Sequence, residues 1–182
     1  VNNEYCKEVL SNLKITKPLK IVVDAGNGAA GPTAINIYKS LGCEVFDFFC
    51  DIDGNFPNHH PNPSIPENLE TLQKQVILNK CDLGIAFDGD GDRCAIVDDT
   101  GKIIWPDRQM MIFSRDLLQR KKGSKIIYDV KSSKHLPDYI KLYGGDAIMC
   151  RTGHSFIKKK MKEVGALLAG EMSGHIFFKE DW

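Results

Sequence analysis

The sequence has no excess of charge of either sign, since lysine plus arginine and aspartate plus glutamate each number 24 among its 182 residues. Nucleic acids and anionic membrane surfaces select basic proteins, so this balance favours neither partner. The sequence also lacks any apolar run approaching the roughly 18 residues of a membrane span, and no signal peptide opens it. With nucleic acid and membrane set aside, the expected partner is a small molecule.

Cysteine pairs with metal-binding or redox spacing are absent as well. None of the six cysteines belongs to a Cys-x-x-Cys motif, and most lie in apolar stretches: Cys6, Cys43, Cys50, Cys81, Cys94 and Cys150. This pattern favours reduced, buried thiols over disulfides or a zinc site, and it indicates a cytoplasmic protein. The chain starts at Val1 and stops at Trp182 directly after a strand-like run, so we expect it to be a piece of a longer protein.

The most informative stretch follows the apolar run Leu83–Phe87, which reads as a buried strand. Directly after it, Asp88, Asp90 and Asp92 occupy alternate positions with only glycine between them. Open α/β sheets bind ligands past the carboxyl ends of their strands, and hard carboxylate oxygens suit Mg²⁺. The sequence therefore predicts that these three carboxylates bind Mg²⁺.

Arg93 follows the three aspartates at once, and its planar guanidinium is well shaped for a phosphate bound to that metal. A polar turn between antiparallel strands is the plainer interpretation, because Asp and Gly both favour turns. An EF-hand is excluded, since the sixth and twelfth positions counted from Asp88 are Arg93 and Asp99 instead of Gly and Glu. A phosphatase of the haloacid-dehalogenase type, with Asp88 as its aspartyl nucleophile, remains open, although Gly91 and Asp92 stand where its usual threonine would be.

Strand-like and helix-like segments alternate along the chain. The first half is expected to contain helices over about 4–13, 32–41 and 66–80 and strands over 20–23, 44–50, 83–87 and 94–98. The second half is expected to contain helices over 106–120 and 133–143, another helix opening at 151–155, and strands over 125–130, 146–150, 167–170 and 175–178. Because the pattern begins afresh near Ile103, we expect two domains, residues 1–103 and 104–182.

Gly26, Gly28 and Gly31 match the dinucleotide-binding fingerprint, in which glycines let a pyrophosphate approach a helix amino end. Pro32, however, stands where that helix should supply a free N–H. A tight strand-to-helix turn explains the glycines adequately, and a dinucleotide-binding module stays as an alternative.

Three further groups of polar residues stand out. His59 and His60 are adjacent in the Pro- and Asn-rich segment 51–66; on an extended chain they point in opposite directions, so we interpret this segment as a rigid surface loop. Arg151–Ser155 combines a cation, hydroxyls and an imidazole at a helix amino end, which suits a phosphate or a sugar hydroxyl; a plain N-cap by Thr152 is the alternative.

The third group is Glu171, Ser173 and His175, which lies between two apolar strands. If this segment is extended, the three side chains project to one side and offer an acceptor, a hydroxyl and a titratable ring to one ligand. Polar side chains grouped in this way cannot contribute to a hydrophobic core, so we expect them to bind a ligand.

Taken together, these residues resemble the α-D-phosphohexomutase superfamily, and specifically its phosphomannomutase/phosphoglucomutase branch. The resemblance spans nearly the whole chain, and the aspartate loop and the Gly-Glu-Met-Ser-Gly-His loop in this order are its most specific features. The segments that carry it are Val23–Gly28, Asp53–Pro57, Asp88–Arg93, Asp129–Lys131, Thr152–Ser155 and Gly170–His175.

The resemblance implies an α/β fold of two similar three-layer α/β/α domains with mixed, mostly parallel sheets, the second and third of the family's four domains. It also implies roles for individual residues. Magnesium would be bound by Asp88, Asp90 and Asp92, with Arg93 beside a phosphoserine; Glu171 and Ser173 would contact sugar hydroxyls; and Lys131, His154 and His175 would lie near the reacting hydroxyl as general acid or base. Arg151 is expected to bind substrate as well, because it provides the cation at the helix amino end described above.

The implied activity is the interconversion of hexose 1-phosphate and hexose 6-phosphate through phosphoserine and a bisphosphate intermediate. Met172 gives a modest argument for mannose or glucose over glucosamine. Neither the phosphoserine loop of the first domain nor the phosphate-binding loop of the fourth occurs in these 182 residues. We therefore expect this chain to need domains 1 and 4 of the same protein for catalysis.

Overall fold

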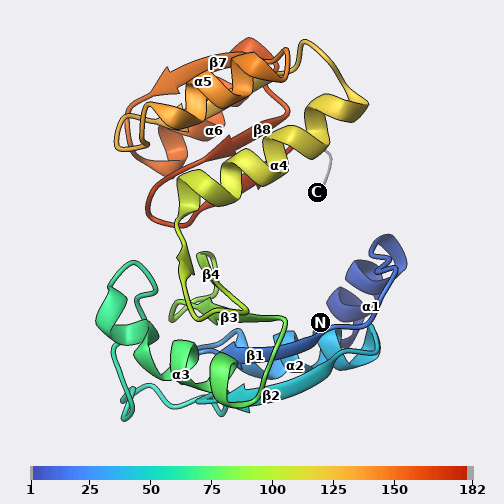
Figure 1. Cartoon of the computed structure of the whole chain (residues 1–182), viewed down its shortest axis with the longest axis vertical. Coiled ribbons are helices and arrows are strands. Elements are labelled where there is room, and N and C mark those ends of the chain that lie inside the picture. Colours follow the sequence, from blue (N-terminus) through green and yellow to red (C-terminus); the bar gives the residue numbers. More distant parts are fainter. Residues whose placement is uncertain (1, 180–182) are drawn as a thin grey trace. The chain divides into compact units, whose positions relative to one another are not determined.

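The computed structural model describes residues 2–179, and the chain divides into two compact units, Val1–Ile104 and Trp105–Trp182. The predicted seam lay one residue earlier, after Ile103. Each unit places one mixed sheet between two layers of helices (Figure 1). The predicted fold class, two similar three-layer α/β/α domains with mostly parallel mixed sheets, is therefore confirmed. Among the helices of residues 2–179, none has the length and apolar character needed to cross a membrane.

The first unit contains a five-stranded sheet. Its elements are α1 (Asn2–Asn12), β1 (Lys20–Asp24), α2 (Gly31–Ser40), β2 (Glu44–Phe48), the 3₁₀ turn η1 (Pro66–Leu69), α3 (Glu70–Leu78), β3 (Leu83–Phe87), β4 (Cys94–Asp98) and β5 (Ile103–Ile104). The strand order is β2-β1-β3-β4-β5. β1 runs parallel to β2 and β3, whereas β4 runs antiparallel to β3 and to β5. The carboxyl ends of β1, β2 and β3 therefore meet at one edge of the sheet.

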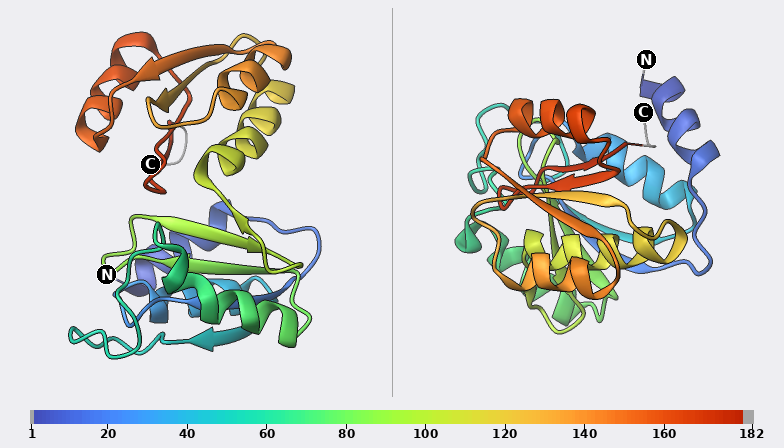
Figure 2. Two further views of the ribbon diagram at one scale, coloured as in Figure 1. Left: turned by 60° about the vertical axis from the view of Figure 1, so that its left-hand side comes forward. Right: turned by 90° about the horizontal axis from the view of Figure 1, so that it is seen from above.

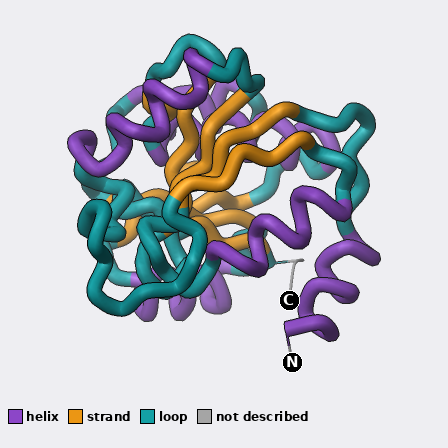
Figure 3. The backbone as a smooth tube through the Cα atoms, turned by 90° about the horizontal axis from the view of Figure 1, so that it is seen from below, coloured by secondary structure: helices purple, strands orange, loops and turns teal. Residues whose placement is uncertain are grey.

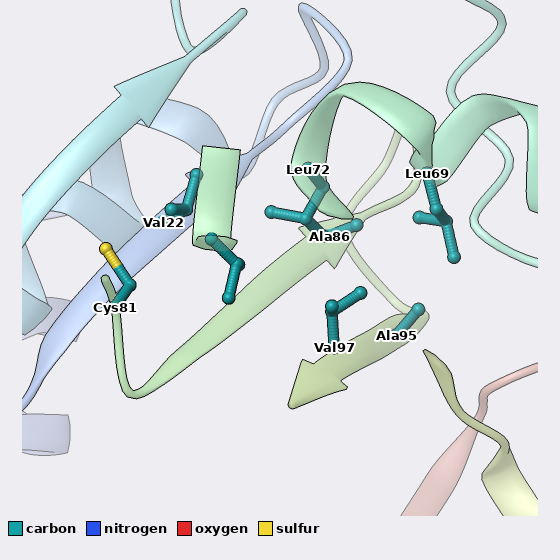
Figure 4. Packing of buried hydrophobic residues seen from close by; sticks show 8 residues of the cluster. Val22, Leu69, Leu72, Cys81, Ala86, Ala95 and Val97 are labelled. Atoms are coloured by element: carbon teal, nitrogen blue, oxygen red, sulfur yellow. The ribbon is translucent and has the colours of Figure 1, made fainter. Parts of the chain in front are cut away.

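Helices cover both faces of this sheet because its central strands are apolar on both sides. On one face, Leu72 and Val76 of α3 pack with Val22, Ala86 and Val97 of three strands (Figure 4). On the other face, α2 packs against the remaining side chains of β1. The strand β1 is thus buried from both directions, which fixes the position of the loops at its end.

The second unit contains a four-stranded sheet in the order β7-β6-β8-β9. Its elements are α4 (Pro106–Arg120), β6 (Lys125–Asp129), α5 (His135–Leu142), β7 (Asp146–Cys150), α6 (His154–Val164), β8 (Leu168–Gly170) and β9 (Ile176–Phe178). Helices α4 and α5 cover one face of the sheet and α6 covers the other (Figure 2). Leu118 and Ile140 pack with Ile126 on the first face, and Ile157 packs in the core on the second.

Most of the expected helices begin within two residues of the predicted start, and two of the observed starts have a visible local cause. The helix expected from Pro66 opens as a 3₁₀ turn and becomes α-helical only at Glu70. The helix expected to open at Arg151–Ser155 starts at His154, because Gly153 adopts a φ of +128° that no helix continues. Between β2 and η1 the chain contains neither helix nor strand (Figure 3), as the prediction of a loop over 51–66 required.

Candidate functional site

The three predicted metal ligands lie together in the loop between β3 and β4. These strands pair residue for residue up to Phe87 and Cys94, so the loop is closed at its base. One carboxylate oxygen from each of Asp88, Asp90 and Asp92 lies within 4.8 Å of the others, and the last two residues are exposed. Three oxygen ligands converging at this spacing fit Mg²⁺, which also needs room for water or phosphate in its coordination shell. The residues present therefore suit the predicted ion.

Asp88 also organises the loop, a role that the sequence did not reveal. Its side chain is 2% exposed. Its Oδ1 accepts the backbone N–H groups of Gly91 and Arg93 at 3.0 and 3.1 Å, and its Oδ2 accepts Nε of Arg93 at 2.6 Å. Burial acts to raise the pKa of Asp88, but the hydrogen bonds and charge of Arg93 outweigh it, so this pKa is lowered. Asp88 therefore stays charged at neutral pH.

Arg93 is held from two sides. Besides the contact with Asp88, its Nη1 donates to Oδ1 of Asn62 at 3.1 Å. Nη2 makes no hydrogen bond within residues 2–179, so it is the guanidinium nitrogen left to donate to a phosphate, whereas Nε and Nη1 are already used by the protein.

The glycine-rich turn after β1 packs against this loop. A Cβ on Gly28 would lie 2.8 Å from the carbonyl oxygen of Gly89 and 2.9 Å from that of Asp88, and the N–H of Ala29 donates to the Gly89 carbonyl at 2.9 Å. A Cβ on Gly31 would collide with the backbone of Cys50. Close contacts within the chain thus account for two glycines of the dinucleotide fingerprint. The match to the fingerprint therefore no longer supports the dinucleotide-binding alternative.

The interpretation of segment 51–66 as a surface loop holds for His60, which is exposed, but is wrong for His59. Nε2 of His59 lies 3.0 and 3.1 Å from the two carboxylate oxygens of Asp24, whose side chain has no exposure. The hydrogen bond to Asp24 raises the pKa of His59, although burial opposes it. The local sequence could not show this pair, because its members lie 35 residues apart.

The second unit carries its polar residues in the corresponding loop, between β8 and β9. This loop is a turn, in which Gly174 N–H donates to the Glu171 carbonyl at 3.1 Å, so the premise of an extended segment was wrong. The three side chains nevertheless come together: Nδ1 of His175 lies 2.8 Å from Oγ of Ser173 and 3.1 Å from Oε2 of Glu171. The turn achieves the grouping that an extended chain was expected to give.

Glu171 connects this loop to the start of α6. Its side chain is 3% exposed, and its Oε1 accepts the N–H of Gly153 at 2.6 Å. The ring of His154, the next residue, lies 6.1 Å from the ring of His175, centroid to centroid. The interpretation of Thr152 as a plain N-cap is wrong, because Gly153 occupies the cap position and no side chain caps the helix. The structure thus brings Glu171, His175 and His154 into one cluster.

Two other predicted residues lie outside these contacts. The guanidinium of Arg151 stacks on the ring of Phe156, 3.1 Å from its centroid. Lys131 is exposed in the turn after β6, and its ammonium makes no hydrogen bond or ion pair within residues 2–179. Both cations are therefore accessible, but neither is held by the Glu171 cluster.

The sequence reasoning missed the role of Asp129. Its side chain has no exposure and accepts hydrogen bonds from Ser132 Oγ at 3.0 Å, Thr152 Oγ1 at 3.4 Å and the N–H of Met172 at 3.2 Å. It therefore ties together three segments that surround the end of β6. The available signal was its position as the last residue of a buried strand, which it shares with Asp24.

Two α/β/α units, one with a triple-aspartate loop and one with a buried Glu–His loop in the same topological position, define a class of duplicated α/β proteins. Family models bear this out. The model described as "Phosphoglucomutase/phosphomannomutase, alpha/beta/alpha domain II" matches residues 3–101, and the corresponding model of domain III matches residues 105–182. The chain belongs to the phosphoglucomutase/phosphomannomutase family, as its resemblance predicted.

Individual relatives agree with the family models. The chain is 55% identical to a phosphomannomutase/phosphoglucomutase of Pseudomonas putida over 99% of this chain and 39% of the relative. It is 53% identical to a phosphoglucomutase of Neisseria meningitidis over 100% of this chain and 40% of the relative. A crystal structure of a phosphoglucomutase/phosphomannomutase family protein from Burkholderia thailandensis superimposes with a TM-score of 0.97 at 51% identity, over 100% of this chain and 40% of that one. The chain thus spans about 40% of the length of these relatives.

Proposed function

We propose that this chain forms the metal-binding and sugar-binding domains of a phosphohexomutase that interconverts hexose 1-phosphate and hexose 6-phosphate, with mannose or glucose as the sugar. The observation that carries the proposal is the presence of two different polar loops at equivalent positions, one with three converging carboxylates and one with a buried Glu–His pair. The phosphoserine and the fourth domain belong to the remaining part of the longer protein, and so does the ability to complete the reaction.

The first unit supplies the groups that handle phosphate. Asp88, Asp90 and Asp92 would hold Mg²⁺, which when bound neutralises charge on the transferring phosphoryl group. Arg93 is held by Asp88 through Nε, and its Nη2 can donate to a phosphoryl oxygen. The arginine is thereby positioned before substrate arrives.

The second unit supplies the groups that handle the sugar. Glu171 and Ser173 offer an acceptor and a hydroxyl to the sugar hydroxyls, and an exposed Arg151 offers charge to the distal phosphate. Because Nδ1 of His175 faces the Glu171 carboxylate at 3.1 Å, the neutral ring keeps its proton on Nδ1 and its basic nitrogen is Nε2. His175, His154 and Lys131 are the candidates for moving the proton of the reacting hydroxyl.

The alternative of an aspartyl-nucleophile phosphatase is disfavoured by the position of Asp88. A nucleophilic carboxylate must reach the phosphorus atom, but Asp88 is 2% exposed and both of its oxygens accept hydrogen bonds from Arg93. Failure to trap an acyl-phosphate on this residue with beryllofluoride is the expected result. The predicted cytoplasmic location belongs to the mutase proposal, because the free thiols of the chain suit a reducing compartment.

The test is a phosphate-transfer assay on the full-length protein, with mannose 1-phosphate and glucose 1-phosphate as substrates, in the presence and absence of Mg²⁺. We expect turnover that depends on the metal and is abolished by Asp90→Ala. The matched control is Asp99→Ala, which removes another exposed aspartate beyond β4 and should leave the rate unchanged. Unchanged activity in Asp90→Ala, or no conversion of either sugar phosphate, would contradict the proposal.

A further inference from the structure

The loop between β2 and η1, residues 49–65, holds the ring of His59 between two acceptors. Nε2 lies 3.0 and 3.1 Å from the oxygens of Asp24, and Nδ1 lies 3.0 Å from the carbonyl oxygen of His60. A carboxylate and a carbonyl can only accept hydrogen bonds, so both ring nitrogens must carry hydrogen. His59 is therefore an imidazolium in this arrangement.

The surroundings of the ring keep that charge in place. The side chains of Asp24 and His59 are 0% and 17% exposed, and the ring of Phe49 packs edge-on against the imidazole with centroids 5.5 Å apart. Within residues 2–179, Asp24 is the charged side chain that contacts the ring. Its hydrogen bond raises the pKa of His59 above 6.5, against the effect of burial. Removing either partner would leave a buried group without its counterpart.

A chain of hydrogen bonds leads from this pair to the loop between β3 and β4, residues 88–93, which holds the predicted metal ligands and is called the metal loop below. The carbonyl of His60 accepts both the ring N–H of His59 and, at 2.8 Å, the backbone N–H of Asn62. Oδ1 of Asn62 in turn accepts Nη1 of Arg93 at 3.1 Å and a backbone N–H two residues further on at 3.1 Å. Because both of these neighbours are donors, the amide has one orientation. The links run without interruption from Asp24 to Arg93.

Packing and backbone strain also mark this loop as constrained. Pro61 is buried against the turn after β1 and against the metal loop, 3.0 Å and 3.3 Å from where a Cβ on Gly26 and on Gly89 would lie. Phe49 and Phe56 adopt φ values of 51° and 49°, a left-handed conformation that is unfavourable for aromatic residues. Such strain persists only where the surrounding structure enforces it, and it gathers near functional sites.

We propose that Asn62 is a positioning residue for Arg93, and that the ion pair of His59 with Asp24 holds Asn62 in place. With Nε fixed by Asp88 and Nη1 fixed by Asn62, the guanidinium plane has two anchors and cannot rotate about its stem. Loss of the ring proton turns a nitrogen lone pair toward an acceptor and so loosens the loop. This inference rests on the proposed function only where it assigns a phosphate to Arg93.

The test uses the full-length protein labelled with ¹⁵N in histidine and arginine. At pH 7 we expect proton signals on both ring nitrogens of His59. His59→Gln should accelerate hydrogen exchange at the Arg93 Nε–H about tenfold, the equivalent of one charge-assisted hydrogen bond. The matched control, His60→Gln, changes the exposed neighbouring ring and should leave that exchange unchanged. After correction for the intrinsic rate, exchange in the wild type should also rise with pH as His59 titrates, and in His59→Gln it should not.

A second pair of variants tests Asn62 without touching the ion pair. Asn62→Ala should accelerate Arg93 exchange about tenfold while the His59 signals stay unchanged, and Asn62→Asp, which keeps an acceptor for Nη1, should restore slow exchange. A His59 ring with one proton at pH 7, or unchanged Arg93 exchange in Asn62→Ala, would overturn the proposal, even if His59→Gln fails to fold. In the mutase assay, kcat should fall in Asn62→Ala and recover in Asn62→Asp. Absence of mutase activity in the wild type would refute the proposed function, and the exchange results would then decide this inference by themselves.

Discussion

The two units repeat one arrangement of strands down to the sequence of the central strand. β1 reads Lys-Ile-Val-Val-Asp and β6 reads Lys-Ile-Ile-Tyr-Asp, and the final residue of each, Asp24 or Asp129, has no exposure. The partners of these two carboxylates differ. Asp24 faces a charged imidazole from a distant loop, whereas Asp129 accepts hydroxyl and amide hydrogens from neighbouring segments. The same position in the fold therefore forms an ion pair in one unit and accepts hydrogen bonds from uncharged donors in the other.

The loops that follow β3 and β8 also differ in the partners of their buried carboxylates. Each begins with a buried carboxylate bound by a later residue of its own loop, Asp88 by Arg93 and Glu171 by His175. In the first unit the arginine neutralises its partner permanently, and two further aspartates are left facing solvent. Within residues 2–179, Asp88, Asp90 and Asp92 form the one group of three side chains placed to hold a metal ion. The second unit has a hydroxyl and an imidazole in its loop instead, so it can recognise a ligand by hydrogen bonds without an ion.

The largest effect that can test this difference is on metal binding. The double variant Asp90→Asn, Asp92→Asn should weaken Mg²⁺ binding by about 1,000-fold, because even the loss of partners outside the coordination shell commonly weakens metal binding ~10–100-fold. Glu171→Gln, in the equivalent loop, should leave it unchanged. Calorimetric titration of the full-length protein gives both affinities, and equal losses in the two variants would break the distinction between the loops.

Stability should also separate the two buried carboxylates. Asp88→Ala leaves a largely buried guanidinium without its counter-charge and should lower the free energy of unfolding by about 3 kcal/mol. Glu171→Ala mainly orphans one backbone N–H and should lower it by about 2 kcal/mol. Asp116→Ala, which breaks an exposed pair with Arg120, serves as control and should stay within about 0.5 kcal/mol. Urea denaturation measures all three, and a reversed order would show that the imidazole contact is the stronger one.

The fourth residue after each strand-end aspartate offers a smaller test. Gly28→Ala should destabilise the first unit by about 2 kcal/mol, because the added methyl group meets the backbone of the metal loop, and it should weaken Mg²⁺ binding as well. In the second unit this position is Ser133, whose buried hydroxyl has no hydrogen-bond partner within residues 2–179. Ser133→Ala should therefore change thermal stability by less than about 0.5 kcal/mol. A tolerated Gly28→Ala would show that the metal loop can move away from the turn.

The smallest effect concerns pH and the two strand-end aspartates. Because folding raises the pKa of His59 above 6.5, its ion pair with Asp24 contributes fully below pH 6.5 and is lost as pH rises through the raised value. We expect the free energy of unfolding to decline over that interval by on the order of 1 kcal/mol in the wild type and to stay level in His59→Gln. Asp129 has no imidazole partner among residues 2–179, so Asp129→Asn should leave this pH dependence intact. Denaturation midpoints at pH 6 and pH 9 provide the measurement.

The sequence predicted those features that depend on residues close together in the chain. The apolar runs predicted the buried strands, and Pro106 and the helical pattern after it gave the bounds of α4 as observed. The three aspartates could be read as a metal loop because their spacing and their place after a buried strand are both local. The same holds for the β8–β9 loop, whose three polar side chains lie together as expected although the assumed backbone was wrong.

What the sequence could not predict depends on contacts between distant segments. Nothing near His59 indicates that its ring pairs with a carboxylate 35 residues earlier, and nothing near Gly28 shows that its missing side chain makes room for Gly89. Asp88 looked like one of three similar ligands, and only the fold shows that it is the buried one. The residue types of a motif indicate which chemistry is possible, whereas burial in the folded chain determines which of its side chains can contact a ligand.

The ladder between β3 and β4 limits how the metal loop can change during evolution or engineering. The two strands pair without a bulge from Leu83 and Asp98 to Phe87 and Cys94, so six residues bridge a fixed gap. Inserting or deleting one residue must either distort that bridge or shift the pairing, and a shift by one would turn every side chain of β4 to the opposite face. The proposed ion site can accordingly be altered by exchanging residues at constant loop length, whereas changes of length should be tolerated in other turns of the unit.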